Sequence, residues 1–238
     1  MTEPDIITTA AWKGGVGKTT LAYELAYQMG AVLADWDWDK GGATVAWGYR
    51  HETRVRAPLL DALERGKTPT PLRGNRKPDL IPSHPDFGVN QPEPDAGATA
   101  LEKWAADLGR RILVDTHPGG CDSTYSALRA ARVVVTPAVL ATKELSALEG
   151  MIEELADYPL LVIPYMVPSV PPGREITRLR QIVARHHIPV GPMVSNYSWI
   201  PRRQLRMAIA SGDPLPARVK PFAEQIRKVA EAVTSYGV

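Results

Sequence analysis

The stretch Lys13-Gly14-Gly15-Val16-Gly17-Lys18-Thr19-Thr20 follows a short apolar run and opens a segment whose apolar residues have helical spacing. Its glycines let the backbone curl with the N–H groups turned inward, since no Cβ obstructs the turn. The helix that follows adds unpaired N–H groups and the positive end of a dipole. Lys18 can reach the β- and γ-phosphates of a nucleotide, and the Thr19 hydroxyl has the right length to ligate Mg²⁺. We therefore predict a phosphate-binding loop made of Gly14, Gly15, Val16, Gly17, Lys18, Thr19 and Thr20.

The loop departs from the general pattern G-x-x-x-x-G-K-[ST], because Trp12 occupies the place of the first glycine. The variant found here, K-G-G-x-G-K-T-T, carries an additional lysine, Lys13. It resembles the deviant Walker A box of the ParA/MinD family of ATPases. The resemblance implies that ATP or ADP binds with Mg²⁺. It also implies that Lys13 crosses a nucleotide-sandwich dimer to the phosphates of the other subunit, so that both lysines are catalytic. The alternative, a glycine-rich turn with two solvated lysines, fits poorly with a position between a strand and a helix.

Length and composition are those of one globular domain. The chain has 238 residues, of which 44% are hydrophobic and 23% charged. A single cysteine, Cys121, excludes an internal disulfide framework and favours a reducing cytosol. Neither a signal-peptide pattern nor an apolar run of roughly 18 residues is present in the sequence. We expect residues 1–238 to form a single ParA-like P-loop ATPase domain in the cytoplasm, without an N-terminal helix-turn-helix extension.

Apolar runs of strand length alternate along the chain with segments of helical periodicity. Strands are predicted at 5–11, 31–35, 79–83, 111–115, 132–136, 160–165 and 192–195. Helices are predicted at 19–29, 59–65, 98–108, 123–131, 142–155, 174–186, 202–210 and 219–235. The alternation predicts an α/β fold of the P-loop NTPase kind, with a mostly parallel twisted sheet and helices on both faces. Right-handed crossovers then bring the C-terminal ends of the strands to one edge, where ligands bind.

Three carboxylates at alternate positions follow the second predicted strand: Asp35, Asp37 and Asp39. Such carboxylates repel one another unless a cation or a positioned water is present. The pattern V-L-x-D-x-D resembles the first switch loop of the family, which implies that Asp37 orients the attacking water. Relatives continue Pro-Gln-Gly, whereas this chain has Trp38-Asp39-Lys40-Gly41. A solvated loop acid is the alternative for Asp37 and the preferred interpretation of Asp39. Three tryptophans flank these elements and suit either a dimer seam or core packing: Trp12, Trp36 and Trp38.

Asp115 ends an apolar strand, Ile112-Leu113-Val114, which is the arrangement a Walker B carboxylate needs to face Mg²⁺, usually through water. The run Asp115-Thr116-His117-Pro118-Gly119 resembles the second switch of the family, D-T-x-P-x. We interpret His117 as a switch-loop or interface residue in preference to a catalytic one. Further resemblance at 79–83 and 192–214 extends the match to about residues 5–235. It places the purine against the loops after Tyr165 and after Asn196.

The C-terminal third is basic, with eleven Lys or Arg against three acids between Arg174 and Lys228. No base-reading module is visible in the sequence, so we expect contacts with DNA phosphates that are nonspecific and sensitive to salt. The predicted DNA-binding residues are Arg174, Arg178, Arg202, Arg203, Arg206, Arg218 and Lys220. A merely solvated charged surface is the alternative.

These features, together with the resemblance, favour a ParA-type DNA-partition ATPase. ATP and Mg²⁺ would drive a homodimer that holds nonspecific DNA on the nucleoid. A ParB-like centromere-binding protein would then stimulate its slow hydrolysis. Three alternatives remain: a MinD-like positioning regulator, a metabolic P-loop ligase or reductase component, and a nucleotide-switch scaffold with little turnover. No membrane partner is expected, because a basic amphipathic tail is missing from the sequence, and the single cysteine argues against an iron–sulfur cluster.

Overall fold

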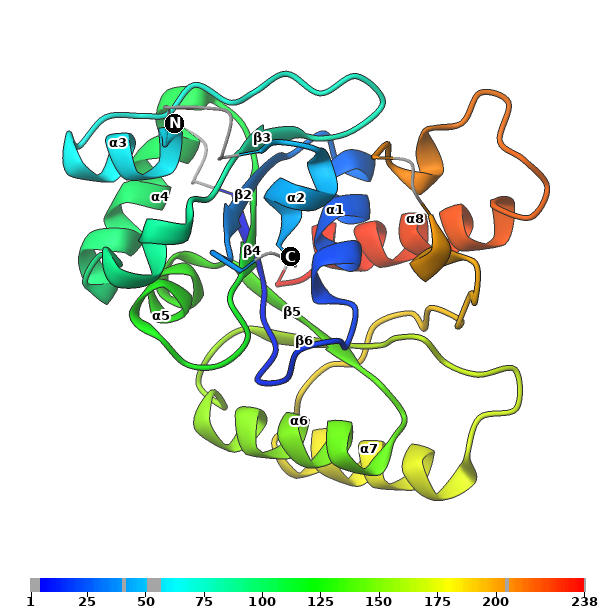
Figure 1. Ribbon diagram of the computed structural model, residues 1–238. Helices are drawn as coiled ribbons and strands as arrows, with labels where there is room; N and C mark the ends of the chain where they lie inside the picture. Colours follow the sequence, from blue (N-terminus) through cyan, green and yellow to red (C-terminus); the bar gives the residue numbers. More distant parts are fainter. Residues whose placement is uncertain (1–4, 40–41, 51–56, 204–205, 238) are drawn as a thin grey trace.

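The computed structural model describes residues 5–39, 42–50, 57–203 and 206–237. A six-stranded sheet lies at its centre in the order β3-β2-β4-β1-β5-β6, and each neighbouring pair of strands is parallel (Figure 1). The strands are β1 (Ile6–Thr9), β2 (Val32–Trp36), β3 (Asp79–Ile81), β4 (Ile112–Thr116), β5 (Val133–Ala138) and β6 (Leu160–Pro164). Nearly every strand residue is buried, as a parallel sheet covered on both faces requires. The predicted α/β fold with a parallel sheet is confirmed.

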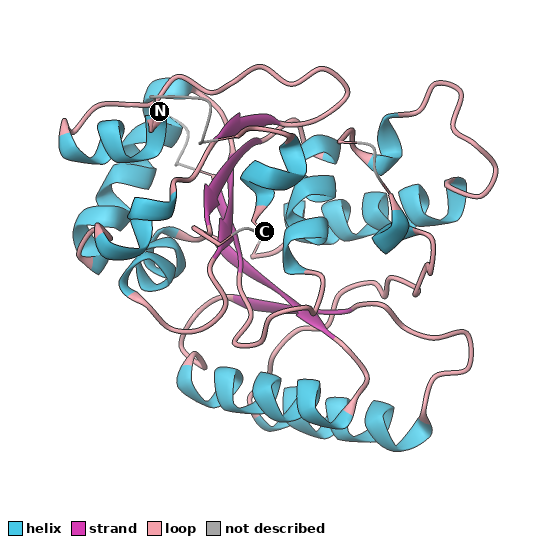
Figure 2. Ribbon diagram, viewed as in Figure 1, coloured by secondary structure: helices cyan, strands magenta, loops and turns pink. Residues whose placement is uncertain are grey.

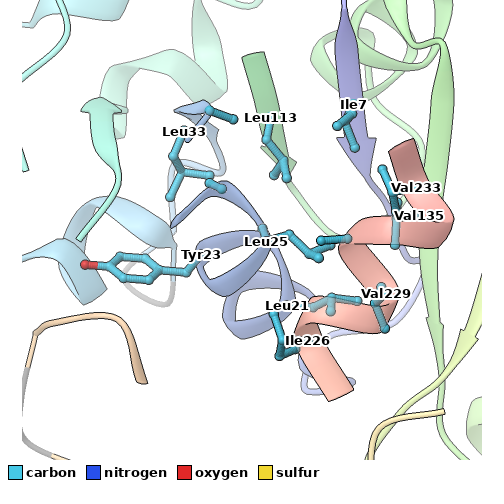
Figure 3. Close-up of a cluster of buried hydrophobic side chains, with 14 of the residues drawn as sticks. Ile7, Leu21, Tyr23, Leu25, Leu33, Leu113, Val135, Ile226, Val229 and Val233 are labelled. Atoms are coloured by element: carbon cyan, nitrogen blue, oxygen red, sulfur yellow. The ribbon is translucent and has the colours of Figure 1, made fainter. Parts of the chain in front are cut away.

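Helices cover both faces of this sheet (Figure 2). Within the described residues the α-helices are α1 (Lys18–Gln28), α2 (Ala43–Trp47), α3 (Pro58–Glu64), α4 (Pro94–Leu108), α5 (Asp122–Ala130), α6 (Thr142–Glu154), α7 (Gly173–Arg185) and α8 (Lys220–Thr234). On one face α1 and α8 pack together over the sheet, where Ile7 and Leu33 meet Leu25 and Val229 (Figure 3). Ile6, one residue away, belongs to the cluster beneath α4 and α5, as the alternation of a strand dictates. The helices α6 and α7 cover the β5–β6 end of that second face.

The prediction of a strand at 192–195 is wrong. Val167 and Ser195 form only an isolated parallel bridge, and the chain runs beside β6 through single hydrogen bonds, such as Val194 N–H to the Pro164 carbonyl at 2.8 Å. Pro192 lies within this stretch and has no N–H to donate, which interrupts a ladder. The segment therefore extends the edge of the sheet as a loop.

The helix predicted at 202–210 is also wrong for the positions that the structure describes, 202–203 and 206–210; positions 204–205 lie outside the described residues. Two short 3₁₀ helices stand there, η3 (Ile200–Arg202) and η4 (Ile209–Ser211), and Arg203 between them is extended. The backbone N–H groups of Ile209 and Ala210 donate to the buried carboxylate of Glu24 on α1, at 2.6 and 3.2 Å. A helix cannot form where a side chain from elsewhere takes its backbone donors.

The loops that leave the C-terminal ends of β1, β2 and β4 meet at one edge of the sheet, in register across the parallel pairs Thr9–Asp115 and Asp35–Asp115. This edge carries the phosphate loop and both predicted switch loops, as expected for an open parallel sheet. Within the described part of the chain, no helix combines the length and apolarity that crossing a membrane would take.

Candidate nucleotide site

The phosphate loop adopts the backbone that its glycines permit. Gly15 and Gly17 have φ values of +81° and +88°, and α1 begins at Lys18 with Gly17 as its left-handed N-cap. A Cβ atom on Gly17 would lie 2.4 Å from Cε1 of Tyr165, whereas one on Gly14 would have no heavy atom within 4 Å. Tyr165 is buried just after β6, so the loop rests on a rigid aromatic wall. The N-terminus of α1 is therefore open toward a phosphate on one side and supported on the other.

A cavity of about 530 Å³ opens over this loop. Its remaining walls come from the switch residues Asp37, Asp39 and Pro118 and from two loops near the end of β6. Those loops contribute Tyr165, Met166, Ser195, Asn196, Tyr197, Ile200 and Pro201. The structure thus brings the phosphate loop and the two loops predicted to hold a purine into one cavity of the size that a small ligand needs.

Lys18 lies at the floor of the cavity between two carboxylates. Its Nζ donates to Oδ1 of Asp115 at 2.7 Å and to the backbone carbonyl of Thr116, and it lies 3.9 Å from Oδ2 of Asp37. All three charged side chains are nearly inaccessible to solvent. Burial strengthens the attraction of Lys18 for both carboxylates and the repulsion between the two carboxylates, so the loss of Lys18 would be costly. The three residues predicted to serve the phosphates, the metal ion and the water are thus in direct or near contact.

Asp35 has a different role from Asp37. It is fully buried, and its carboxylate accepts hydrogen bonds from the N–H groups of Thr44 at 2.5 Å and Asp37 at 3.1 Å. Burial raises the pKa of Asp35 to about 7, and the neighbouring Asp115 adds to the rise. Asp35 therefore ties the first switch loop to α2, a helix that we did not predict from the sequence.

The residues predicted to hold Mg²⁺ fit a hard cation. Burial raises the pKa of Asp115, while Lys18 and the Thr19 hydroxyl oppose the rise by stabilising the carboxylate. Within the described residues, Oδ2 of Asp115 is buried and has no hydrogen-bond partner. A carboxylate oxygen left unpaired beside a threonine hydroxyl is the donor set that Mg²⁺ takes, directly or through water.

Lys13 points away from the cavity floor. Its Nζ forms an ion pair with Oε1 of Glu144 in the first turn of α6, and both side chains are partly exposed. This hydrogen bond is the main cause that lowers the pKa of Glu144. Lys13 is therefore held at the rim of the site by its own chain.

The predicted DNA-binding residues fall into two groups. Arg174 and Arg178 lie on α7. The carboxylate of Glu149 on α6 forms ion pairs with Arg178 and with Arg185, each with a nitrogen–oxygen distance of 3.0 Å. The second group lies between η3 and the start of α8: Arg202, Arg203, Arg206, Arg218 and Lys220. In Figure 1 the helix α7 and this C-terminal segment occupy different sides of the molecule.

Part of the C-terminal group lines a cavity of about 610 Å³, and none of the described residues in its lining is acidic. Arg202, Arg203 and Arg218 line it together with Arg76, an arginine that we did not predict. Arg206 lines a smaller cavity of about 310 Å³ next to Tyr23 and Glu24. Basic side chains around a hollow surface are the electrostatic signature of an anion-binding site.

Glu24 connects this basic segment to α1, the helix that follows the phosphate loop, and we did not predict its role from the sequence. It lies on α1, six positions after Lys18, and its carboxylate accepts the N–H groups of Ile209 and Ala210. The neighbouring Tyr23 hydroxyl donates to the carbonyl of Arg206 at 2.9 Å. The only signal in the sequence was an acid within the otherwise apolar stripe of α1. An unpaired charge buried there would lower the free energy of unfolding.

Glu24→Gln is expected to change how stability depends on pH. Burial raises the pKa of Glu24 to about 7, so the folded state binds a proton more tightly than the unfolded state. The free energy of unfolding of the wild type should therefore fall as pH rises from about 5 to about 7. Glutamine keeps an acceptor oxygen and cannot ionise, so the variant should gain about 1–3 kcal/mol relative to wild type between pH 5 and pH 8.

Urea titrations at several pH values measure this difference. Glu102→Gln on α4 is the matched control, because the side chain of Glu102 is exposed. Parallel pH profiles for wild type and Glu24→Gln would contradict the prediction.

Comparisons with known proteins show which family the chain belongs to. No protein-family model matches the chain. The chain is 30% identical, over 245 aligned positions, to the chromosome-partitioning ATPase Soj of Thermus thermophilus, covering 95% of this chain and 94% of Soj. Its fold matches the cell division protein MinD of Aquifex aeolicus (18% identity, 98% of both chains, TM-score 0.73). It also matches cobyrinic acid a,c-diamide synthase of Mycobacterium smegmatis with an ATP analogue and magnesium (19% identity, 97% and 94% covered, TM-score 0.70).

A parallel sheet with a lysine-bearing phosphate loop between its first strand and first helix defines a P-loop nucleotide-binding protein. The similarity to Soj extends over nearly the whole of both chains. The chain belongs to the ParA/MinD family of P-loop ATPases.

Proposed function

We propose that this protein is a DNA-partition ATPase. It binds ATP with Mg²⁺, forms a nucleotide-sandwich homodimer and holds DNA on the nucleoid without reading its sequence. A ParB-like centromere-binding protein stimulates its slow hydrolysis of ATP. The observation that carries the proposal is the cavity in which Lys18 lies between Asp37 and Asp115, with Lys13 at the rim. The similarity to the partitioning ATPase Soj supports the partition role.

In this proposal the phosphates of ATP lie on the N–H groups of the phosphate loop, with Lys18 against the β- and γ-phosphates. The purine lies between the loops that carry Met166 and Tyr197. Thr19 and Asp115 would hold Mg²⁺, Asp115 through water, and the bound ion would supply positive charge against the phosphates. Phosphate binding would draw Lys18 away from Asp115 and leave that carboxylate free to face a cation.

Asp37 orients the water that attacks the γ-phosphate, and Lys13 of the other subunit stabilises the charge that develops there. Lys13 must leave Glu144 to do so. Because that ion pair is partly exposed, its loss costs little, roughly 1 kcal/mol or less. Dimer formation therefore competes only with a weak contact.

DNA binding is proposed for the C-terminal basic group, with Arg202 and Arg218 as its clearest members. Arg178 and Arg185 on α7 are weaker candidates, because Glu149 already neutralises part of their charge. The double variant Arg202→Ala/Arg218→Ala should reduce the magnitude of the negative slope of log affinity against log salt by about two. The matched double variant Arg178→Ala/Arg185→Ala should change that slope by much less.

Retention on random-sequence duplex DNA at several salt concentrations tests the proposal, with ATP–Mg²⁺, with ADP–Mg²⁺ and without nucleotide. We expect retention only with ATP–Mg²⁺, and we expect salt to weaken it. Equal retention in all three conditions would contradict the partition mechanism. If no condition gave retention, the arginines would be a solvated surface. That result would favour the alternatives: a positioning regulator, a metabolic P-loop enzyme or a nucleotide-switch scaffold.

A further inference from the structure

Trp38 of the first switch loop and His117 of the second lie against each other beside the site. The indole of Trp38 and the imidazole of His117 are stacked, with ring centroids 4.0 Å apart and an interplanar angle of 12°. Nδ1 of His117 lies 3.0 Å from Oδ1 of Asp37. The first switch loop, which carries Trp38 and Asp37, is thereby joined to the second, which carries His117.

We propose that His117 is a positioning residue for hydrolysis, which holds Asp37 so that its second oxygen faces the phosphates. The inference rests on the proposed function, since it assumes that Asp37 orients the attacking water. An ionised carboxylate only accepts hydrogen bonds, so Nδ1 of His117 carries the hydrogen and donates it. The backbone N–H of Asp39 donates to the same Oδ1 at 3.0 Å.

The two oxygens of Asp37 thus have different surroundings. Oδ1 has two donors that come from the switch loops, whereas Oδ2 lies on the side of Lys18, 3.9 Å from its Nζ. Lys18 marks the position of the β- and γ-phosphates. With Oδ1 occupied, Oδ2 is the oxygen that is directed toward a water at the γ-phosphate. A carboxylate held at one oxygen loses rotational freedom, and reaction rates depend steeply on such orientation.

Trp38 keeps the imidazole in place. Its indole packs on one face of His117 and meets Phe87 edge-on at 6.1 Å. Behind it lies Gly88, where a Cβ atom would come within 2.9 Å of the indole nitrogen. The backbone of His117 is fixed as well, because its carbonyl accepts from the Thr124 hydroxyl at 3.3 Å. The ring is therefore confined by the stack and by its own backbone.

The same side chains offer another chemistry, since Asp37, Asp39 and His117 each present a ligand atom within 4.8 Å of the others. A cation bound there would need the imidazole nitrogen as a ligand. A hydrogen bond to Asp37 needs only a donor at the position of Nδ1. The two roles therefore respond differently to substitution by an amide.

The test compares amides of two lengths. His117→Asn places an amide N–H close to the position of Nδ1, whereas His117→Gln places it near Nε2; His117→Ala removes the donor. Single-turnover hydrolysis and multiple-turnover kcat and KM for ATP–Mg²⁺ are measured with DNA present. The variants His117→Ala and His117→Gln should have a kcat about 10- to 100-fold below that of the wild type, and their KM should stay within about twofold of the wild-type value. Asparagine should retain most of the wild-type kcat.

Two outcomes would overturn the inference. A wild-type kcat in His117→Ala, in a protein where Asp37→Ala abolishes hydrolysis, would show that His117 positions nothing and would leave the proposed function intact. Equal loss in the asparagine and alanine variants would favour a ligand or a packing role. If instead the wild type does not hydrolyse ATP, or Asp37→Ala has no effect, the proposed function itself is wrong.

A spectroscopic measurement covers the case in which a variant does not fold. The side-chain ¹⁵N shifts of the histidines in the wild-type protein distinguish a hydrogen on Nδ1 from one on Nε2. The chain has five histidines, so assignment by single substitution is practical. We expect the hydrogen of His117 on Nδ1 in wild type and a mixture of tautomers in Asp37→Ala. A neutral ring with its hydrogen on Nε2 in wild type would contradict the inference.

Discussion

Gly17→Ala is expected to abolish ATP binding, whereas Gly14→Ala should leave it nearly unchanged. Both glycines belong to the phosphate loop, but they differ in backbone and surroundings. Gly17 has φ +88°, and a Cβ there would lie 2.4 Å from a ring carbon of the buried Tyr165. Gly14 has neither a positive φ nor a heavy atom within 4 Å of such a Cβ. The side chain at position 17 must therefore displace either the loop or the aromatic wall behind it.

Gly15→Ala separates backbone strain from steric clash. Its φ is +81°, yet its Cβ would have open space. Left-handed backbone costs a residue with a Cβ about 1–2 kcal/mol, so this variant should bind ATP about tenfold more weakly. The double variant Gly17→Ala/Tyr165→Val removes the clash and keeps the strain. It should recover binding toward the level of Gly15→Ala.

Isothermal titration calorimetry with ATP–Mg²⁺ measures the affinities, and thermal unfolding shows whether each variant is folded. Comparable affinities for the three single variants would mean that the loop rearranges freely when it binds phosphate. The step from Gly14 to Gly15 depends on the left-handed backbone of Gly15, and the step to Gly17 depends on its contact with Tyr165. The spacing of glycines in the sequence reveals neither.

The loop itself, by contrast, was predictable. Glycines, a lysine and a threonine at fixed spacing between a strand and a helix encode a local structure, and local structure follows from local sequence. The same holds for Asp115, because an apolar strand that ends in a carboxylate delivers it to the edge of a parallel sheet. The first prediction needed only the local motif, and the second needed only the direction of the strand.

The family resemblance singled out Asp37, but the spacing of the acids did not show that Asp35 would be buried against the backbone of α2. Asp35 and Asp37 stand two residues apart on the same loop, yet Asp35 binds the backbone of α2 while Asp37 faces Lys18. Asp39 is 63% exposed and lies 3.8 Å from His117. Which carboxylate is buried depends on how α2 docks, and residues 40–41, which lie between Asp39 and α2, are outside the described residues.

Long-range contacts explain the other failures. The segment 202–210 has helical spacing, but Glu24, about 185 positions earlier in the chain, binds its backbone donors. Trp36 is one of the three tryptophans whose sequence positions suited either a dimer seam or core packing. It is fully buried and packs against Phe87 and Trp104. Nothing in the local sequence distinguishes it from Trp38, which instead stacks on His117.

Lys18→Ala should have the second large effect, and it should act on both binding and stability. The lysine provides the cation for the phosphates, so ATP affinity should fall by about 100-fold or more. In the nucleotide-free protein it also neutralises Asp115, which is fully buried. Removing one member of a buried ion pair costs about 3–5 kcal/mol, because the other charge is left without a partner. The free energy of unfolding should fall by that order.

A second substitution separates these two effects. Lys18→Ala/Asp115→Asn removes the orphaned charge, so it should regain much of the lost stability while ATP binding stays absent. Lys13→Ala is the matched control, since Lys13 pairs with Glu144 at the partly exposed rim. It should cost less than about 1 kcal/mol and should leave ATP binding by the monomer intact, while impairing the dimer and turnover. Urea unfolding and calorimetry on the four proteins give both quantities. If Lys18→Ala bound ATP as well as Lys13→Ala does, the phosphates would not lie where the contacts of Lys18 place them.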